Sequence, residues 1–312
     1  MRIIFMGSPE FALPSLRKLI ESGHEVVAVY TQPDRPTGRG RRLAPPPVKA
    51  LALEYGLPVR QPRSISKPEA VDELRALRPD MGIIAAYGQI LKQSVLDSFP
   101  LDVLNVHASL LPRWRGAAPI PAAILAGDAE SGATIMRVVL ALDAGPMLAR
   151  VTVPIAPDDT TATLTPKVAE AGAQLLLDVL SPHAAGAIQP EQQDDALATY
   201  APQIEKADAL IDWSRNSAAR IERMVRAYDP WPIAYSYLDG AALRLHRVAV
   251  LPGRSGAASG TIVASGDGIA VAAQDADVAL LRVQGPGGKL MSGAEYLRGH
   301  REIVGRRLVA ER

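Results

Sequence analysis

Cysteine is absent from the 312 residues of this sequence, and histidine occurs only five times. The absence of cysteine excludes disulfides, cysteine-ligated zinc or iron–sulfur centres, and any cysteine nucleophile. The scarcity of histidine leaves few ways to hold a metal, and we expect none. The first residues do not resemble a targeting segment, and no run of about 18 apolar residues occurs. We therefore expect a cytoplasmic protein that does not enter a membrane.

An excess of charge of one sign is also lacking. Lys and Arg number 34 and Asp and Glu number 33, which gives a formal net charge of +1. This balance excludes a uniformly basic surface for nucleic acid or acidic membranes. The length suits two domains, and the hydrophobic content of 48% allows a sizeable core without covalent cross-links.

The first half of the sequence alternates short apolar runs with segments of helical periodicity. The apolar runs are typical of buried parallel strands, and they occupy residues 2–6, 26–30, 81–86 and 103–107. This alternation predicts an α/β fold with a doubly wound, mostly parallel sheet of the Rossmann-like kind. Two later runs, 134–139 and 147–153, are close enough in sequence to form an antiparallel pair.

The pattern changes in the second half. Residues 190–207 are polar and contain proline, which is typical of a linker. Short β-like runs separated by Gly-rich turns follow at 243–250, 260–263, 269–272 and 278–283. These runs predict a small β-barrel of the OB-like kind. We expect a larger domain over 1–189, the linker over 190–207, and a smaller domain over 208–312.

Two common motifs are missing. Gly7-Ser8-Pro9 follows the first strand where dinucleotide-binding folds have G-x-G-x-x-G, and Pro9 offers no backbone N–H to a pyrophosphate. A nicotinamide or flavin enzyme is therefore disfavoured. The motif G-x-S-x-G does not occur either, so no serine sits in a nucleophile elbow.

The stretch 105–116, which reads N-V-H-A-S-L-L-P-R-W-R-G, is the most informative part of the sequence. Asn105 and His107 are two residues apart on a predicted strand, so their side chains share one face. An isolated histidine at a strand end is usually a structural residue with its hydrogen bonds satisfied. Here the neighbouring amide, the Leu-Leu-Pro break, and Arg113 and Arg115 favour a functional role.

Asp143 lies in the turn Leu-Asp-Ala-Gly-Pro between two apolar runs. An aspartate in such a position is often only a turn former. Its functional interpretation is a carboxylate directed at His107, which fixes the imidazole and stabilises its charged form. An amide, an imidazole and a carboxylate without a nucleophile of the protein predict direct acyl transfer to an amine or water.

The segment 34–49 is strongly basic. It contains five basic residues and one acid, Asp34, for a local net charge of +4, and its two glycines and four prolines predict an irregular loop. Its basic residues are Arg35, Arg39, Arg41, Arg42 and Lys49. A solvated loop is one interpretation and a nucleic-acid contact is the other. Residues 208–312 add fourteen basic residues against eleven acidic ones, a weaker signal of the same kind.

Several of these segments together resemble the methionyl-tRNA formyltransferase family of folate-dependent formyltransferases, and the match extends over essentially the whole chain. The segments that resemble the family are 6–9, 33–42, 86–88, 105–116, 142–146 and 229–232. The Asn-x-His-x-Ser-Leu-Leu-Pro pattern is typical of folate-dependent formyltransferases as a group. The basic loop and the second domain narrow the resemblance to the family that acts on tRNA.

The resemblance implies that 10-formyltetrahydrofolate is the formyl donor. It implies that Asn105 donates to the formyl oxygen, that His107 assists proton transfer, and that Asp143 is the partner of His107. It also assigns a folate site to Ala86, Tyr87, Gly88, Ser109, Leu110, Leu111 and Pro112. The sequence departs from the family at Ala141 and Ala144, where Gly and Thr are usual, so a threonine hydroxyl is missing from this loop.

The resemblance further implies that methionyl initiator tRNA is the acceptor. Separately, we expect the protein to be a monomer. The basic segment 34–49 would enter the acceptor arm, with Arg41 and Arg42 as the principal contacts, and the C-terminal barrel would bind tRNA. An aminosugar nucleotide, glycinamide ribonucleotide or water are alternative acceptors. A non-catalytic tRNA-binding module is an alternative of another class, which the triplet Asn105, His107 and Asp143 disfavours.

Overall fold

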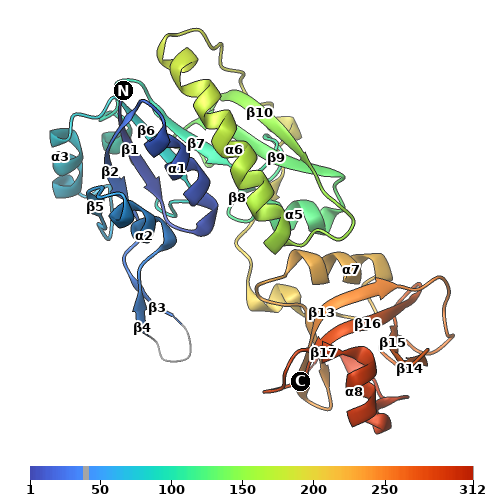
Figure 1. Ribbon diagram of the computed structural model, residues 1–312. Coiled ribbons are helices and arrows are strands. Elements are labelled where there is room, and N and C mark those ends of the chain that lie inside the picture. Colours follow the sequence, from blue (N-terminus) through green and yellow to red (C-terminus); the bar gives the residue numbers. More distant parts are fainter. Residues whose placement is uncertain (38–41, 312) are drawn as a thin grey trace. The chain divides into compact units, whose positions relative to one another are not determined.

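The computed structural model describes residues 1–37 and 42–311, which form two compact units (Figure 1). Unit 1 comprises Met1–Pro119, Glu130–Pro154 and Thr165–Ala201. Unit 2 comprises Ile120–Ala129, Ile155–Leu164 and the chain from Pro202 onwards. Two short segments from the first half of the sequence therefore fold with the C-terminal part. The continuous boundaries expected from the sequence stay a prediction.

Unit 1 is built on a seven-stranded sheet with the order β10-β9-β7-β6-β1-β2-β5. Its strands are β1 (Arg2–Gly7), β2 (Glu25–Tyr30), β5 (Val59–Arg60), β6 (Met81–Ala85), β7 (Val103–His107), β9 (Glu130–Arg137) and β10 (Met147–Pro154). All neighbours are parallel except β9, which runs antiparallel to both β7 and β10. The predicted α/β class, the mostly parallel sheet and the antiparallel pair are confirmed.

Helices cover both faces of this sheet because the strand side chains alternate between two apolar clusters. Ile3 and Phe5 of β1 pack in one cluster with α1, α2 and α6, while Ile4 and Met6 pack in the other with α3 and α4. These helices are α1 (Leu13–Glu21), α2 (Pro47–Glu54), α3 (Pro68–Ala76), α4 (Gln93–Leu96) and α6 (Thr161–Ala184), with the 3₁₀ turn η1 (Glu10–Ala12) before α1. No helix among the described residues is long and apolar enough to cross a bilayer.

The chain order reverses between β1 and β6, whose carboxyl ends lie side by side with Gly7 paired to Ala85. In doubly wound sheets, ligands bind outside the carboxyl ends of the strands at such a reversal. Only glycine fits at position 7, because a Cβ atom there would lie 2.8 Å from the carbonyl oxygen of Ala85. The end of β7 is next along the same edge, and this edge is where a site is expected.

The basic segment is partly regular. Residues Arg35–Thr37 form β3 and Arg42–Ala44 form β4, and the two pair as an antiparallel ribbon that precedes α2. The expectation of an irregular loop is therefore wrong for these six residues. Among the described residues each strand pairs only with the other, so Pro36 occupies an edge position, where a missing backbone N–H is tolerated.

Unit 2 contains a second seven-stranded sheet, in which every pair is antiparallel. Its strands are β12 (Tyr235–Leu238), β13 (Ala241–Val250), β14 (Ile262–Ser265), β15 (Gly268–Ala272), β16 (Asp277–Gln284), β17 (Met291–Ser292) and β18 (Leu308–Val309). Its helices and 3₁₀ turns are α5 (Pro119–Ala126), η3 (Lys206–Ala209), α7 (Ala218–Ala227), α8 (Gly293–Gly299) and η4 (Arg301–Ile303). The first residue of α5, Pro119, is counted with unit 1. Trp213 is fully buried in the core and donates from Nε1 to Ser236 Oγ at 3.1 Å. The predicted small barrel-like domain is confirmed.

Three arginines of α7 hold the two early segments within unit 2. Arg220 donates to the carbonyl oxygen of Leu125 at 2.7 Å, and Arg223 donates to that of Ala126 at 3.4 Å. Arg226 donates to the carbonyl oxygen of Asp159 at 3.0 Å. Leu125 and Ala126 are the last residues of α5, where cations satisfy orphan carbonyls and complement the helix dipole. These arginines are therefore part of the internal structure of the unit.

Candidate active site

The site begins at the carboxyl end of β7. Val103 packs with the α3/α4 cluster and Leu104 with the α1/α6 cluster, so the alternation of the strand places Asn105 and His107 on the same side as Val103. Asn105 is half-buried, and its carboxamide has no hydrogen-bond partner among the described residues. The predicted sharing of one face by these two side chains is confirmed, and the amide is free to bind a ligand.

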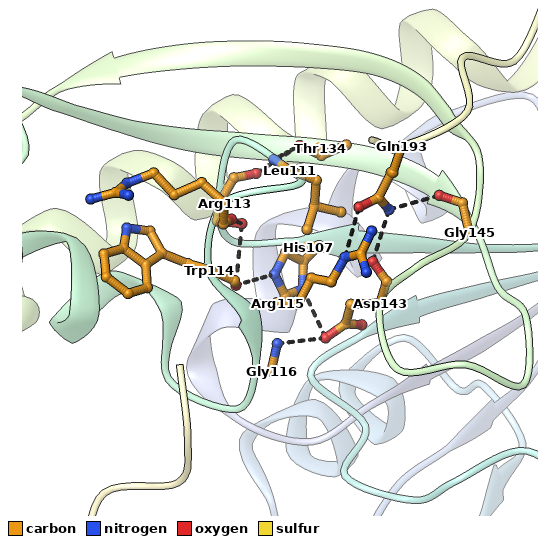
Figure 2. A network of polar contacts seen from close by, with 11 residues as sticks. His107, Leu111, Arg113, Trp114, Arg115, Gly116, Thr134, Asp143, Gly145 and Gln193 are labelled. Carbon is orange, nitrogen blue, oxygen red and sulfur yellow. Dashed lines mark hydrogen bonds and ion pairs between the residues drawn. The ribbon is translucent and has the colours of Figure 1, made fainter. Parts of the chain in front are cut away.

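His107 is 6% exposed and is held by a backbone carbonyl. Its Nε2 lies 2.9 Å from the carbonyl oxygen of Trp114, which can only accept, so Nε2 carries the proton (Figure 2). In the neutral imidazole the lone pair is then on Nδ1. That atom lies 3.7 Å from Oδ2 of Asp143. The ring therefore has one atom able to accept a proton, and a carboxylate lies beside it.

Asp143 is fixed by backbone groups. Its Oδ2 accepts a hydrogen bond from the N–H of Gly116 at 2.9 Å, and its own φ of 46° is in the left-handed region. Such a conformation costs a non-glycine residue on the order of 1 kcal/mol and persists where the surroundings enforce it. Gly145 closes the same loop, since a Cβ atom there would lie 1.8 Å from the carbonyl oxygen of Arg137.

The segment expected to be a linker contributes a residue to this site. Gln193 donates from Nε2 to the carbonyl oxygens of Asp143 and Gly145, both at 2.8 Å, and accepts at Oε1 from Nε of Arg115 at 2.9 Å (Figure 2). Residues of this segment form η2 (Asp195–Leu197) and β11 (Tyr200–Ala201), and β11 pairs in parallel with β8 (Arg115–Gly116). Nothing in the sequence marks Gln193, because its partners are backbone carbonyls and a distant arginine.

The residues 109–112 form a tight turn that is anchored to β9. Thr134 Oγ1 donates to the carbonyl oxygen of Ser109 at 2.7 Å and accepts from the N–H of Leu111 at 3.1 Å. Ser109 Oγ donates to the carbonyl oxygen of Arg113 at 2.6 Å. Leu111 is buried, whereas Leu110 and Pro112 are half-buried. Thr134 is a second residue of the site that the sequence analysis missed.

The residues 86–88 follow β6 directly. Ala86 and Gly88 both have positive φ and are exposed, while Tyr87 is buried. Gln32 Nε2 donates to the carbonyl oxygen of Tyr87 at 3.1 Å and so fixes the turn. Burial, followed by the nearby Tyr30, raises the pKa of the Tyr87 hydroxyl, which therefore stays protonated. The exposed residues Ala86 and Gly88 thus lie just beyond the carboxyl end of β6, the strand next to β7.

The basic residues have different surroundings. Lys49 donates to both carboxylate oxygens of Asp34, at 2.9 and 2.8 Å, and to Gln61 at 2.8 Å. Hydrogen bonds from Lys49 and then Gln61 hold the pKa of Asp34 below its usual value. Arg35 is exposed and donates to Gln32 Oε1 at 3.3 Å. Arg42 is the first residue of β4, whereas Arg39 and Arg41 lie outside the described residues.

The structure brings Asn105, His107 and Asp143 together at one sheet edge, with the turns 86–88 and 109–112 on the neighbouring chain segments. Within the described part of the chain, no group of three or more His, Asp or Glu side chains is placed to hold a metal. An amide donor, a proton acceptor and a carboxylate suit stabilisation of a developing oxyanion together with proton transfer.

Comparison with known proteins agrees with this chemistry. The chain matches the family model described as formyl transferase over residues 1–180 and that of the formyl transferase C-terminal domain over residues 203–301. The methionyl-tRNA formyltransferase of Pseudomonas putida (strain GB-1) is 49% identical over 302 residues, with 97% of each chain covered. That of Methylococcus capsulatus is 49% identical over 308 residues, with 99% of each chain covered.

Solved structures share the fold at low sequence identity. An N-formyltransferase from Helicobacter canadensis, solved with folinic acid and dTDP-3-aminofucose, has a TM-score of 0.68 at 15% identity and covers 91% of this chain and 99% of its own. HypX from Aquifex aeolicus, solved with tetrahydrofolic acid, has a TM-score of 0.65 at 19% identity and covers 97% of this chain and 48% of its own. The near-complete match to much closer relatives decides the family. The chain belongs to the methionyl-tRNA formyltransferase family.

Proposed function

We propose that this protein transfers the formyl group of 10-formyltetrahydrofolate to the α-amino group of methionyl initiator tRNA. The observation that supports it most is the convergence of Asn105, His107 and Asp143 at the edge of the sheet, in a chain without a cysteine or an elbow serine. The relatives at 49% identity are named for this reaction. With no nucleophile of the protein, the amine of the acceptor attacks the formyl carbon directly.

Each of the three side chains has one task in this reaction. Asn105 donates its amide N–H to the formyl oxygen as the oxygen gains negative charge. The new bond joins the amine nitrogen to the formyl carbon, and Nδ1 of His107 takes the proton that the nitrogen releases. The bond from the formyl carbon to the folate nitrogen then breaks, and that nitrogen receives the proton. Asp143 stabilises the imidazolium in between.

We assign the folate to the two turns that flank these residues. Ala86, Tyr87 and Gly88 offer backbone groups to the pterin, and Ser109, Leu110, Leu111 and Pro112 line the other side. Both turns are held by side-chain hydrogen bonds, from Gln32 and Thr134. Two proteins of the same fold were solved with folate compounds, which supports this assignment.

We assign the tRNA to the basic segment 34–49 and to unit 2. Arg35, Arg39, Arg41 and Arg42 contact the phosphates of the acceptor arm. Lys49, at the end of this segment, adds a further positive charge, and its ammonium is paired with Asp34. Phosphate contacts by arginine position the nucleic acid without reading its sequence. A monomeric state and a cytoplasmic location stay predictions.

One assay separates the possible acceptors. The protein is incubated with a labelled formyl donor and with methionyl initiator tRNA, a dTDP-aminosugar, glycinamide ribonucleotide, or no acceptor. We expect label only on the methionyl-tRNA. Transfer to the sugar or to the ribonucleotide, or release of formate without an acceptor, would refute the proposal. Binding of tRNA without any transfer would indicate a non-catalytic module.

A further inference from the structure

We propose that Gln193 is a positioning residue of the active site, which acts by holding the loop that presents Asp143 to His107. The catalytic part of this inference rests on the proposed function. It makes the segment from Glu191 to Ala201, which resembles a linker in sequence, a structural part of the site.

The two hydrogen bonds from Gln193 bracket the bend of the loop. Its Nε2 donates to the carbonyl oxygens of Asp143 and Gly145, each at 2.8 Å. Both hydrogens of the amide are therefore used on one loop. Asp143 has a φ of 46°, and the neighbouring Ala141 and Ala144 offer no polar side chain to hold this conformation. The strained loop needs an external support, and Gln193 supplies it.

Arg115 fixes which way the amide of Gln193 points. A guanidinium only donates, so the Gln193 atom that lies 2.9 Å from Arg115 Nε is the oxygen. The nitrogen of the amide must then face the two carbonyls, where only a donor is useful. Arg115 is itself 3% exposed, and its Nη2 pairs with Asp195 Oδ1 at 2.8 Å. The orientation of Gln193 is thus set by a buried, paired cation.

Asp143 is held from two sides by neighbouring residues of β8. Gly116, next to Arg115 in sequence, donates its N–H to the carboxylate of Asp143 at 2.9 Å. The side chain of Arg115 holds Gln193, which in turn holds the backbone of Asp143. Asp143 is therefore fixed at its carboxylate and at its carbonyl from two adjacent residues of β8. Glu191 adds a backbone pairing with Met147, where the loop joins β10.

The loop position matters because the carboxylate is at a distance from His107 that is sensitive to small shifts. Oδ2 of Asp143 is 3.7 Å from Nδ1, which is beyond hydrogen-bond length but within reach of a charge. A loop without its two donors shifts this oxygen while leaving Asn105 and both folate turns in place. Loss of Gln193 is therefore expected to reduce kcat without changing KM.

The test compares Gln193→Met, which keeps the length of the side chain but has no donor, with Gln192→Met as a matched control. Gln192 is exposed and forms no hydrogen bond with a described residue. We expect Gln193→Met to lower kcat on the order of 10-fold to 10²-fold at unchanged KM, and Gln192→Met to behave as wild type. In an Asp143→Ala background, Gln193→Met should cause no further loss. Unchanged kcat, or a loss that adds to that of Asp143→Ala, would overturn the inference.

A second measurement does not depend on the reaction. Amide hydrogen exchange of residues 141–147 should accelerate in Gln193→Met and in Gln193→Glu, whose carboxylate keeps the pairing with Arg115 but cannot donate to the carbonyls. Exchange in the 109–112 turn should stay as in the wild type. An inactive wild type would refute the proposed function alone, whereas unchanged loop exchange in both variants would refute the support role of Gln193.

Discussion

Nδ1 of His107 and the N–H of Gly116 both face Oδ2 of Asp143, at 3.7 Å and 2.9 Å respectively. The hydrogen bond is thus made to the backbone, and the contact with the imidazole is electrostatic. This arrangement keeps a negative charge next to the one nitrogen of His107 that can accept a proton. The carboxylate then favours the imidazolium as it forms, without occupying the lone pair beforehand.

Asp143→Asn tests whether this residue acts through its charge. The asparagine oxygen still accepts from Gly116, so the loop keeps its anchor, but the negative charge is lost. We expect kcat for methionyl-tRNA formylation to fall on the order of 10²-fold, with an unchanged melting temperature. Steady-state kinetics and thermal unfolding check this. Wild-type turnover in Asp143→Asn would mean that the residue serves only as a turn anchor.

Asn105→Ala and Asn105→Asp test the amide donor. The carboxamide of Asn105 has no partner among the described residues, so its removal should leave the fold as stable as before. Both variants lack the N–H that we assign to the formyl oxygen, and each should lose at least about 10²-fold in kcat. The matching variant His107→Ala should lose a similar factor. Near-wild-type formylation by either alanine variant would contradict the assigned role.

The positions of the strands along the chain and the shared face of Asn105 and His107 were predictable because they depend on local patterns. An apolar run such as 103–107 predicts a buried strand, and the alternation of side chains along a strand places residues 105 and 107 on one face. The OB-like second domain followed in the same way from short apolar runs and glycine turns.

Long-range hydrogen bonds could not be predicted from the sequence. Gln193 bonds to backbone carbonyls about 50 residues away, and Thr134 joins a turn that begins 25 residues earlier. Such partners are backbone carbonyls, which nearly every residue has in the same form, so the sequence does not mark them. They are identified only when the folded chain brings the two segments together. The inclusion of residues 120–129 and 155–164 in unit 2 is of this kind too, since the arginines that hold them resemble a solvated helix face.

Lys49→Met should raise the pKa of Asp34. The hydrogen bond from Lys49 is the largest cause of its lowered pKa, so without the ammonium the pKa rises toward its ordinary value. The pKa of Asp34 is lower in the folded protein than in the unfolded chain. The pairing of Lys49 with Asp34 therefore stabilises the folded protein at pH values above the unfolded pKa. The stabilisation is lost as the pH falls through the folded value. NMR titration of the Asp34 carboxyl carbon measures this, and an identical titration in Lys49→Met would disprove the pairing.

Gly116→Ala should damage both stability and turnover. A Cβ atom at this position would lie 2.6 Å from the carbonyl oxygen of Ala201, and the φ of +116° is itself unfavourable for alanine. We expect a loss of about 1–3 kcal/mol in unfolding free energy, because β8 must separate from β11. The N–H that holds Asp143 moves with it, so kcat should also fall. Gly23→Ala is the matched control, since its Cβ meets nothing within 4 Å.

Arg247 of β13 is paired with Arg282 of β16 at a point where the register is irregular. Both arginines are exposed, and neither forms a salt bridge with a described residue. Like charges on paired residues destabilise a sheet by roughly 0.2–1 kcal/mol. Because Arg282 also interacts favourably with Glu295, the change is made at its partner, and Arg247→Gln should make the protein slightly more stable. If the pair binds tRNA phosphates, the same change should weaken tRNA binding and reduce the salt dependence by about one unit of slope. Arg254→Gln, in an exposed loop, is the control for net charge. Thermal unfolding and tRNA binding across a salt series measure both effects. If the two arginines bind tRNA, the variant should be more stable and should bind tRNA more weakly. Higher stability with unaltered tRNA affinity would show that this face of unit 2 does not bind tRNA.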